Sequence, residues 1–214
     1  MPVDRVIDAA VELVDEVGPR EFSMRLLAQR LGSSTATLYR HFAGKDEILV
    51  QVVERVLGEV HLHYPDLPAA SWQDQLIAGA DALFQTLKHH PRTVSLFDNH
   101  VPFGPHGLAG REAALSILLS TGFPPEIAAK AYTAVAHYVI GFAGQLHLDS
   151  TTTPDETQDL RTFYRSLDPA RYPATVTSAP HLPGSLEDEF HFGLQLIVHG
   201  LARHLPSEGR GLPG

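Results

Sequence analysis

The sequence contains no cysteine among its 214 residues, and this absence excludes several kinds of protein. Without thiols the chain has no disulfide framework, no thiol redox switch and no thiolate metal site. It also lacks an apolar run long enough to cross a bilayer, and acidic residues interrupt the apolar pattern near its start, unlike in a signal peptide. These absences predict a cytoplasmic protein with no membrane partner.

The signatures of common enzyme classes are missing as well. No Walker A sequence, HExxH, GxSxG or Rossmann glycine pattern occurs, and the acidic residues fall mainly on polar helix faces. The 13 histidines raise the alternative of a metal sensor, but neighbouring histidines lack the i, i+4 spacing of a two-histidine site on one helix. The pairs concerned are His61 with His63, His89 with His90, and His100 with His106. We therefore predict no catalytic residue, no cofactor and no bound metal, and the metal sensor is disfavoured.

Apolar residues recur at helical spacing through most of the chain, with no strand run and no fixed-period repeat. The sequence therefore predicts an all-α fold. Proline, glycine and capping residues give approximate bounds for the helices. We expect helices near 3–17, 23–31, 34–42, 44–63, 71–90, 108–120, 126–148, 160–167 and 186–204.

The stretch from Ser23 to Lys45 has the pattern of a helix-turn-helix, in which two short helices are joined by a tight turn. Ser23 is a predicted N-cap, and Gly32 supplies the left-handed conformation that such a turn needs. The net charge of the whole chain is -9, which argues against a nucleic-acid partner. Between Arg20 and Lys45, however, five basic residues face one acidic residue, Glu21, so this window carries a charge of +4. The sequence thus predicts a local DNA-binding surface on an acidic protein.

These patterns divide the chain into two predicted domains. Residues 1–46 form a helix-turn-helix domain, and the helix at 44–63 joins it to a helical body spanning 47–205. Proline and threonine are frequent in 149–185, which we interpret as a flexible linker within the body, and the glycine-rich tail 206–214 is predicted to be disordered.

The first sixty or so residues resemble the TetR/AcrR family of bacterial repressors. The similarity lies in the runs VIDAAVELVDEVG, FSMRLLAQRLG and TLYRHFAGKDEIL. Further along, SWQD, the Gly-Phe pair after the helix at 108–120, AVAHYVIG and FHFGLQLIVHGL resemble the C-terminal domain of the tetracycline-repressor subgroup. Nearly the whole chain is covered, weakly in the linker.

The resemblance implies a mechanism. Such proteins are homodimers in which helices corresponding to 126–148 and 186–204 form a four-helix bundle. The helix-turn-helix domains of the two subunits, called heads below, bind successive major grooves of a palindromic operator in double-stranded DNA. A small-molecule effector in each body moves the helix corresponding to 44–63 and releases the DNA.

Matching of motif positions assigns DNA-binding residues. In the family, the positions of Arg25, Thr35, Thr37 and Arg40 meet bases or adjacent phosphates, whereas those of Tyr39, His41 and Lys45 hold the backbone. Arginine can contact a guanine edge with two hydrogen bonds, which agrees with this assignment. The full predicted set is Arg25, Ser34, Thr35, Thr37, Tyr39, Arg40, His41 and Lys45.

Effector contacts follow from the same resemblance. His61 matches a histidine that the tetracycline repressors use to contact their drug. Other matched positions differ, because Gly79 replaces asparagine, Phe97 falls at or near the metal-binding histidine, Ala114 replaces glutamine and Gln145 replaces glutamate. A magnesium-chelated tetracycline would lose its metal partners here, so we predict a largely apolar, partly aromatic effector instead. The full predicted set is His61, Leu83, Phe84, Phe97, His100, Leu115, Phe142 and Gln145, and ordinary core packing is an equally good interpretation of each.

Two other functions are weighed against a ligand-released repressor. One is an enzyme carrying a DNA-binding head, which the absence of catalytic motifs disfavours. The other is a dimeric DNA-binding regulator that senses no small molecule and acts as an activator or through protein contacts. A ligand that weakens operator binding would distinguish the repressor from this last alternative.

Overall fold

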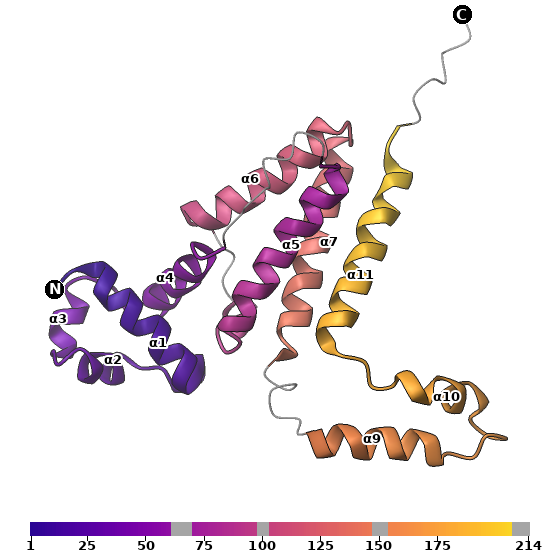
Figure 1. The fold of residues 1–214 in the computed structure, drawn as a ribbon. Helices are drawn as coiled ribbons and strands as arrows, with labels where there is room; N and C mark the ends of the chain where they lie inside the picture. The colour runs from indigo at the N-terminus through magenta and orange to yellow at the C-terminus, as the bar shows by residue number, and fades with distance from the viewer. Residues whose placement is uncertain (61–69, 98–102, 147–153, 207–214) are drawn as a thin grey trace, which may run out of the picture.

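The computed structural model describes residues 1–60, 70–97, 103–146 and 154–206. Every regular element in these ranges is a helix, as the sequence predicts (Figure 1). None of these helices has the length and hydropathy needed to span a membrane. The α-helices are α1 (Val3–Glu21), α2 (Met24–Arg30), α3 (Thr35–Tyr39), α4 (Lys45–Leu57), α5 (Trp72–His89), α6 (Pro105–Ser120), α7 (Pro125–Ala143), α9 (Pro154–Ser166), α10 (Pro173–Ser178) and α11 (Leu186–Leu201). Three short 3-10 helices lie at Val94–Leu96, Ala179–His181 and Ala202–His204.

The head consists of α1, α2 and α3, with the start of α4 packed against α1. The predicted cap at Ser23 is present, because its hydroxyl accepts a hydrogen bond from Leu26 N–H at 3.3 Å, and Ser34 caps α3 by accepting one from Thr37 N–H at 3.2 Å. Gly32, at φ 59°, makes the tight turn between α2 and α3. The helix-turn-helix geometry predicted from the sequence is therefore confirmed.

Gly18 interrupts α1, as its position before a proline predicts. Its backbone has φ 79° and ψ 161°, outside the helical region, and a further turn continues to Glu21. The predicted helix at 3–17 is thus confirmed up to this kink. The apolar face of α1, including Val6, Ala10 and Val14, is fully buried and forms the centre of the head.

The body is built from α5, α6, α7 and α11, and Figure 1 shows α11 running along the far side of α7 from the head. Ser71 and Asp74 form a complete capping box at the start of α5. Aromatic side chains fill the space between the helices. Phe84 of α5 stacks on Phe190 of α11 with ring centroids 3.9 Å apart, so these two helices share one core.

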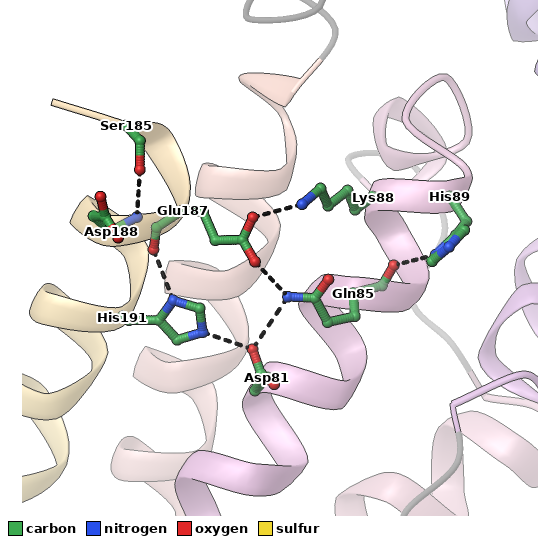
Figure 2. A network of polar contacts seen from close by, with 8 residues as sticks. All are labelled: Asp81, Gln85, Lys88, His89, Ser185, Glu187, Asp188 and His191. Atoms are coloured by element: carbon green, nitrogen blue, oxygen red, sulfur yellow. Dashed lines mark hydrogen bonds and ion pairs between the residues drawn. The ribbon is translucent and has the colours of Figure 1, made fainter. Parts of the chain in front are cut away.

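Polar contacts also fix α11 against α5, as Figure 2 shows. His191 on α11 lies 2.8 Å from Asp81 on α5, and the amide of Gln85 donates to both Asp81 and Glu187. Lys88 pairs with Glu187 at 2.5 Å. Since these side chains are partly exposed, each contact adds little energy, and their main effect is to set the register between the two helices.

Several sequence-based bounds are wrong. Helix α4 ends at Leu57 instead of near residue 63, and α7 ends at Ala143 instead of near residue 148; a glycine, Gly58 or Gly144, is the C-cap in each case. Two further segments differ. The segment 103–107, expected as part of a loop, instead contains the first turn of α6, which begins at Pro105. Residues 149–185, expected to be a flexible linker, contain α9, which is longer than the predicted helix at 160–167, and also α10. Helix α9 packs against α10 and the 3-10 helix that follows it, and this local packing explains the additional helical structure.

Candidate nucleic-acid interface and internal cavity

The outer face of α3 is open to solvent over most of its length. Leu38 is fully buried and anchors the helix, while Thr35, Tyr39 and Arg40 are exposed on its other side. Tyr39 is 56% exposed, which is high for an aromatic residue and rules out core packing as its role in this chain. Arg25 on α2 and His41 after α3 are exposed too. The short α3 therefore presents a convex polar surface of the kind that enters a major groove.

Three of the predicted DNA contacts are already engaged within the chain. Ser34 is the N-cap of α3, and its hydroxyl also lies 3.1 Å from the Thr37 hydroxyl. Lys45 donates from Nζ to the carbonyl oxygen of Pro19 at 2.8 Å and lies 5.9 Å from the Phe22 ring centroid. In this geometry Lys45 satisfies a carbonyl at the end of α1 and joins α1 to α4.

Not every basic residue of the +4 window is available for DNA. Arg30 pairs with Glu12 and Glu16 on α1, and the hydrogen bond to Glu16 raises the pKa of its guanidinium. Arg25 and Arg40 have no such carboxylate among the described residues. The positive charge left at the α2–α3 surface thus comes mainly from these two arginines.

A cavity of about 140 Å³ lies inside the body, between α4, α5, α6 and α7. Most of its wall is apolar, and several wall positions are glycine or alanine. The lining residues are Leu57, Val60, Leu76, Gly79, Ala80, Leu83, Phe97, His106, Gly107, Gly110, Arg111, Ala114, Tyr132, Val135, Ala136, Val139 and Ile140. An apolar cavity with a few polar groups is the usual form of a small-molecule site.

The predicted effector residues divide into three groups. Leu83 and Phe97 line the cavity, as do Gly79 and Ala114, two of the positions that differ from the tetracycline repressors. His61 and His100 lie outside the described residues. Four others are located elsewhere: Phe84 is buried against Phe190, Phe142 packs on Tyr138, Leu115 packs on the core, and Gln145 is exposed.

The polar groups of the cavity escaped prediction from the sequence. They are His106, Arg111 and Tyr132, and they come from α6 and α7. Arg111 donates from Nε to the Tyr132 hydroxyl at 3.3 Å, and its guanidinium lies 5.7 Å from the tyrosine ring centroid. Gly107, Gly110, Arg111 and Ala114 recur at three- and four-residue spacing, and this row of small residues beside an arginine is the sequence signal for the wall.

Helix α4 belongs to both the head and the cavity. It packs on α1, where Arg55 in its last turn pairs with Asp4 and Asp8, and Leu57 in the same turn and Val60 just beyond it form part of the cavity wall. Glu54 on the same helix accepts hydrogen bonds from the backbone N–H groups of His106 and Gly107, in the first turn of α6. A carboxylate is favoured at a helix N-terminus, so Glu54 acts as a cap supplied by a distant segment.

A second polar contact joins head and body at the end of α5. The His90 ring lies between two carboxylates, with Nδ1 2.7 Å from Asp15 on α1 and Nε2 3.0 Å from Glu59 after α4. The hydrogen bond to Asp15, and then that to Glu59, raise the pKa of His90 from 6.5 to about 9, while burial opposes them. The imidazole is therefore protonated at neutral pH and donates to both carboxylates. Arg92 adds a hydrogen bond to the carbonyl oxygen of Glu16.

The molecule thus has an exposed helix-turn-helix face and a helical body. The cavity of the body is lined in part by α4, the helix that also packs in the head. These features define a helix-turn-helix protein with a regulatory body. Among the described residues, no three histidine or acidic side chains are grouped in a way that would hold a metal ion.

Comparison with known proteins identifies the family. Residues 6–52 match the model of the bacterial regulatory proteins, tetR family, and residues 64–205 match the tetracyclin repressor-like C-terminal domain. An HTH-type transcriptional regulator of Saccharopolyspora erythraea is 33% identical over 93% of this chain and 84% of its own length. The HTH-type transcriptional repressor DrrR1 of Streptomyces coeruleorubidus is 30% identical over 94% of this chain and 77% of its own. The crystal structure of the Streptomyces coelicolor TetR family protein ActR in complex with actinorhodin is similar with a TM-score of 0.84, at 28% identity, covering 95% of this chain and 97% of that one.

The chain belongs to the TetR family and is a transcriptional regulator rather than an enzyme. The resemblance inferred from its sequence motifs is thereby confirmed.

Proposed function

We propose that this protein is a dimeric repressor that binds a palindromic operator and is released from it by a small, largely apolar molecule other than tetracycline. The observation that supports this most directly is the double role of α4. Leu57 in its last turn and Val60 just beyond it line the cavity, and α4 also packs on α1 in the head. A molecule that fills the cavity therefore displaces the helix that joins the cavity to the head.

The hydrogen bonds of Glu54 connect the cavity wall on α6 to α4. Because Glu54 holds the first turn of α6, and His106 and Gly107 of that turn line the cavity, a shift of α6 caused by a ligand pulls on α4. Gly104 and Gly58 allow the close approach, since a Cβ at Gly104 would collide with Glu54, and one at Gly58 would lie 3.0 Å from His106 Nε2. The ligand-bound state then differs from the operator-bound state in the orientation of the head, so the ligand site and the DNA-binding surface are two distinct sites that are coupled through α4.

Dimerisation through α7 and α11 is supported by apolar side chains that a single chain leaves exposed. Phe192 and Leu196, one helical turn apart on α11, are 67% and 60% exposed. Ala134 and Gly141 on α7 are exposed as well, and they are small enough for close helix packing. A second copy of the chain that covers this surface would form the four-helix bundle expected of the family.

The DNA-binding part is tested by selecting duplexes from a random library with the purified protein. We expect the selected sequences to contain an inverted repeat. The variant in which Arg25→Gln and Arg40→Gln are combined should bind the selected duplex at least about a hundredfold more weakly and remain dimeric. Arg171→Gln, a change on an exposed arginine outside the head, serves as the control and should bind normally. Normal binding by the double variant would show that the reading face has been assigned wrongly.

The ligand part is tested by screening apolar aromatic compounds for release of the selected duplex. A compound that weakens DNA binding in the native protein, and does so less in a variant with a filled cavity, supports the proposal. Gly110→Leu is suitable for that variant because a Cβ at Gly110 meets no atom within 4 Å. If none of a broad set of compounds changes DNA affinity, the regulator without a small-molecule ligand becomes the better account.

A further inference from the structure

We propose that the cavity binds an aromatic carboxylic acid and that Arg111 pairs with its carboxylate. This inference rests on the proposed function, in which the cavity is the effector site, and it specifies the chemical class of the effector. The observations concern the charge, the hydrogen bonding and the shape of the wall.

The charge of the wall is one-sided. Among the 17 described lining residues, eleven are apolar and three are glycine, and the remaining three are His106, Arg111 and Tyr132. None of the 17 is acidic. An arginine beside apolar surface loses part of its hydration, and an anion in the cavity would restore the lost interaction.

Arg111 has hydrogen-bonding capacity left for a ligand. Its Nε is used by the Tyr132 hydroxyl at 3.3 Å, and no carboxylate of the described residues pairs with it. By contrast, Arg30 and Arg55 each pair with two carboxylates in the head. The contacts with Tyr132 restrain the guanidinium, and its Nη groups can meet a planar carboxylate with two parallel hydrogen bonds.

The shape of the wall favours a flat body. Gly79, Gly107, Gly110 and Ala114 leave the wall without large side chains on parts of α5 and α6, whereas Leu83 and Phe97 provide apolar contact. The volume of about 140 Å³ is close to that of a protein cavity of about 150 Å³ that accepts benzene. One aromatic ring system with a short acidic substituent fits these dimensions.

The experiment compares two molecules of nearly equal shape, phenylacetate and phenylacetamide, by isothermal titration with the full-length protein. We expect the acid to bind at least about tenfold more tightly than the amide, since a charge-assisted pair with arginine is the main difference between them. Arg111→Gln should reduce the affinity of the acid to that of the amide and leave the amide unchanged. Gly110→Leu should weaken both, which assigns the binding to the cavity.

Arg171→Gln is the matched control, because Arg171 also stacks on a tyrosine, Tyr172, at 5.3 Å from the ring centroid, but does not line the cavity. This variant should keep the preference for the acid. Equal affinities for acid and amide, a preference that survives Arg111→Gln, or no binding of either compound at millimolar concentration would each overturn the inference.

The same samples separate this inference from the proposed function. An amide that binds as tightly as the acid and releases operator DNA would overturn the role of Arg111 and leave the release mechanism intact. An acid that binds through Arg111 and leaves operator affinity unchanged would support the cavity assignment and contradict the release mechanism.

Discussion

His90 should make the stability of this protein depend on pH in a window set by its own titration. In the folded chain its imidazolium donates to Asp15 and Glu59, and its pKa is raised from 6.5 to about 9. The folded state therefore holds this proton more tightly than the unfolded chain. The stabilisation is complete below pH 6.5, decreases as the pH rises, and is lost above about pH 9.

The size of the effect follows from the pKa. A difference of this size corresponds to about 3 kcal/mol, at about 1.4 kcal/mol per pKa unit. The His90 side chain is 13% exposed, whereas Glu59 is 49% exposed, so water screens the second ion pair. We expect a contribution of about 2 kcal/mol below pH 6.5 and almost none above pH 9.

The assay is urea unfolding of the native protein and of His90→Asn at a fixed protein concentration, at about pH 6 and about pH 9.5. The variant should be less stable by about 2 kcal/mol at the lower pH and nearly equal to the native protein at the higher pH. His89→Asn is the control, because the exposed His89 ring contacts only the Gln85 carbonyl oxygen of its own helix among the described residues. A loss for His90→Asn that is the same at both pH values would refute the assignment of the raised pKa to the two carboxylates.

Two further changes test other contacts. Glu54→Gln removes the negative charge from the start of α6. This variant should reduce the effect of a bound ligand on operator affinity severalfold and leave the ligand affinity itself little changed. Ligand titration and DNA binding, both measured on the same variant, check this prediction. Gly193→Ala places a Cβ in collision with the Tyr138 hydroxyl between α7 and α11 and should destabilise the protein by about 1–3 kcal/mol in urea unfolding. In Gly110→Ala the added Cβ meets no atom within 4 Å, and this variant should stabilise the protein by about 0.5–1 kcal/mol. Equal effects of the two glycine substitutions would contradict the packing at Gly193.

The head could be predicted closely because its determinants are local in sequence. Ser23, Gly32 and Ser34 define the ends of short helices through contacts within three or four residues, and such contacts follow from residue type and spacing. The same holds for Ser71 and Asp74 at the start of α5. Where a helix end is fixed by residues adjacent to it in the sequence, those residues are enough to predict it.

The start of α6 could not be predicted in this way. The cap on His106 and Gly107 comes from Glu54, which lies 52 residues earlier in the chain, so the segment reads as a loop until the fold is known. Phe84 shows a related limit. Its aromatic side chain fits either a ligand cavity or the core, and the rotation of α5 decides for the core against Phe190. From the sequence alone Arg111 would be interpreted as a solvated surface charge, because the rotation of α6 that turns it toward the cavity is not set by its sequence neighbours.

The contacts between head and body indicate how the protein can respond to a small ligand. Glu54 connects the last turn of α4 to the start of α6, and His90 connects the turn after α4 and the middle of α1 to the end of α5. Both contacts are polar and partly exposed, with strengths of about 1–2 kcal/mol. A ligand that binds one head orientation only about 2 kcal/mol more tightly than the other can change the population ratio about thirtyfold. Polar contacts of this strength therefore help to hold the head in a defined orientation and still allow a cavity ligand to change it.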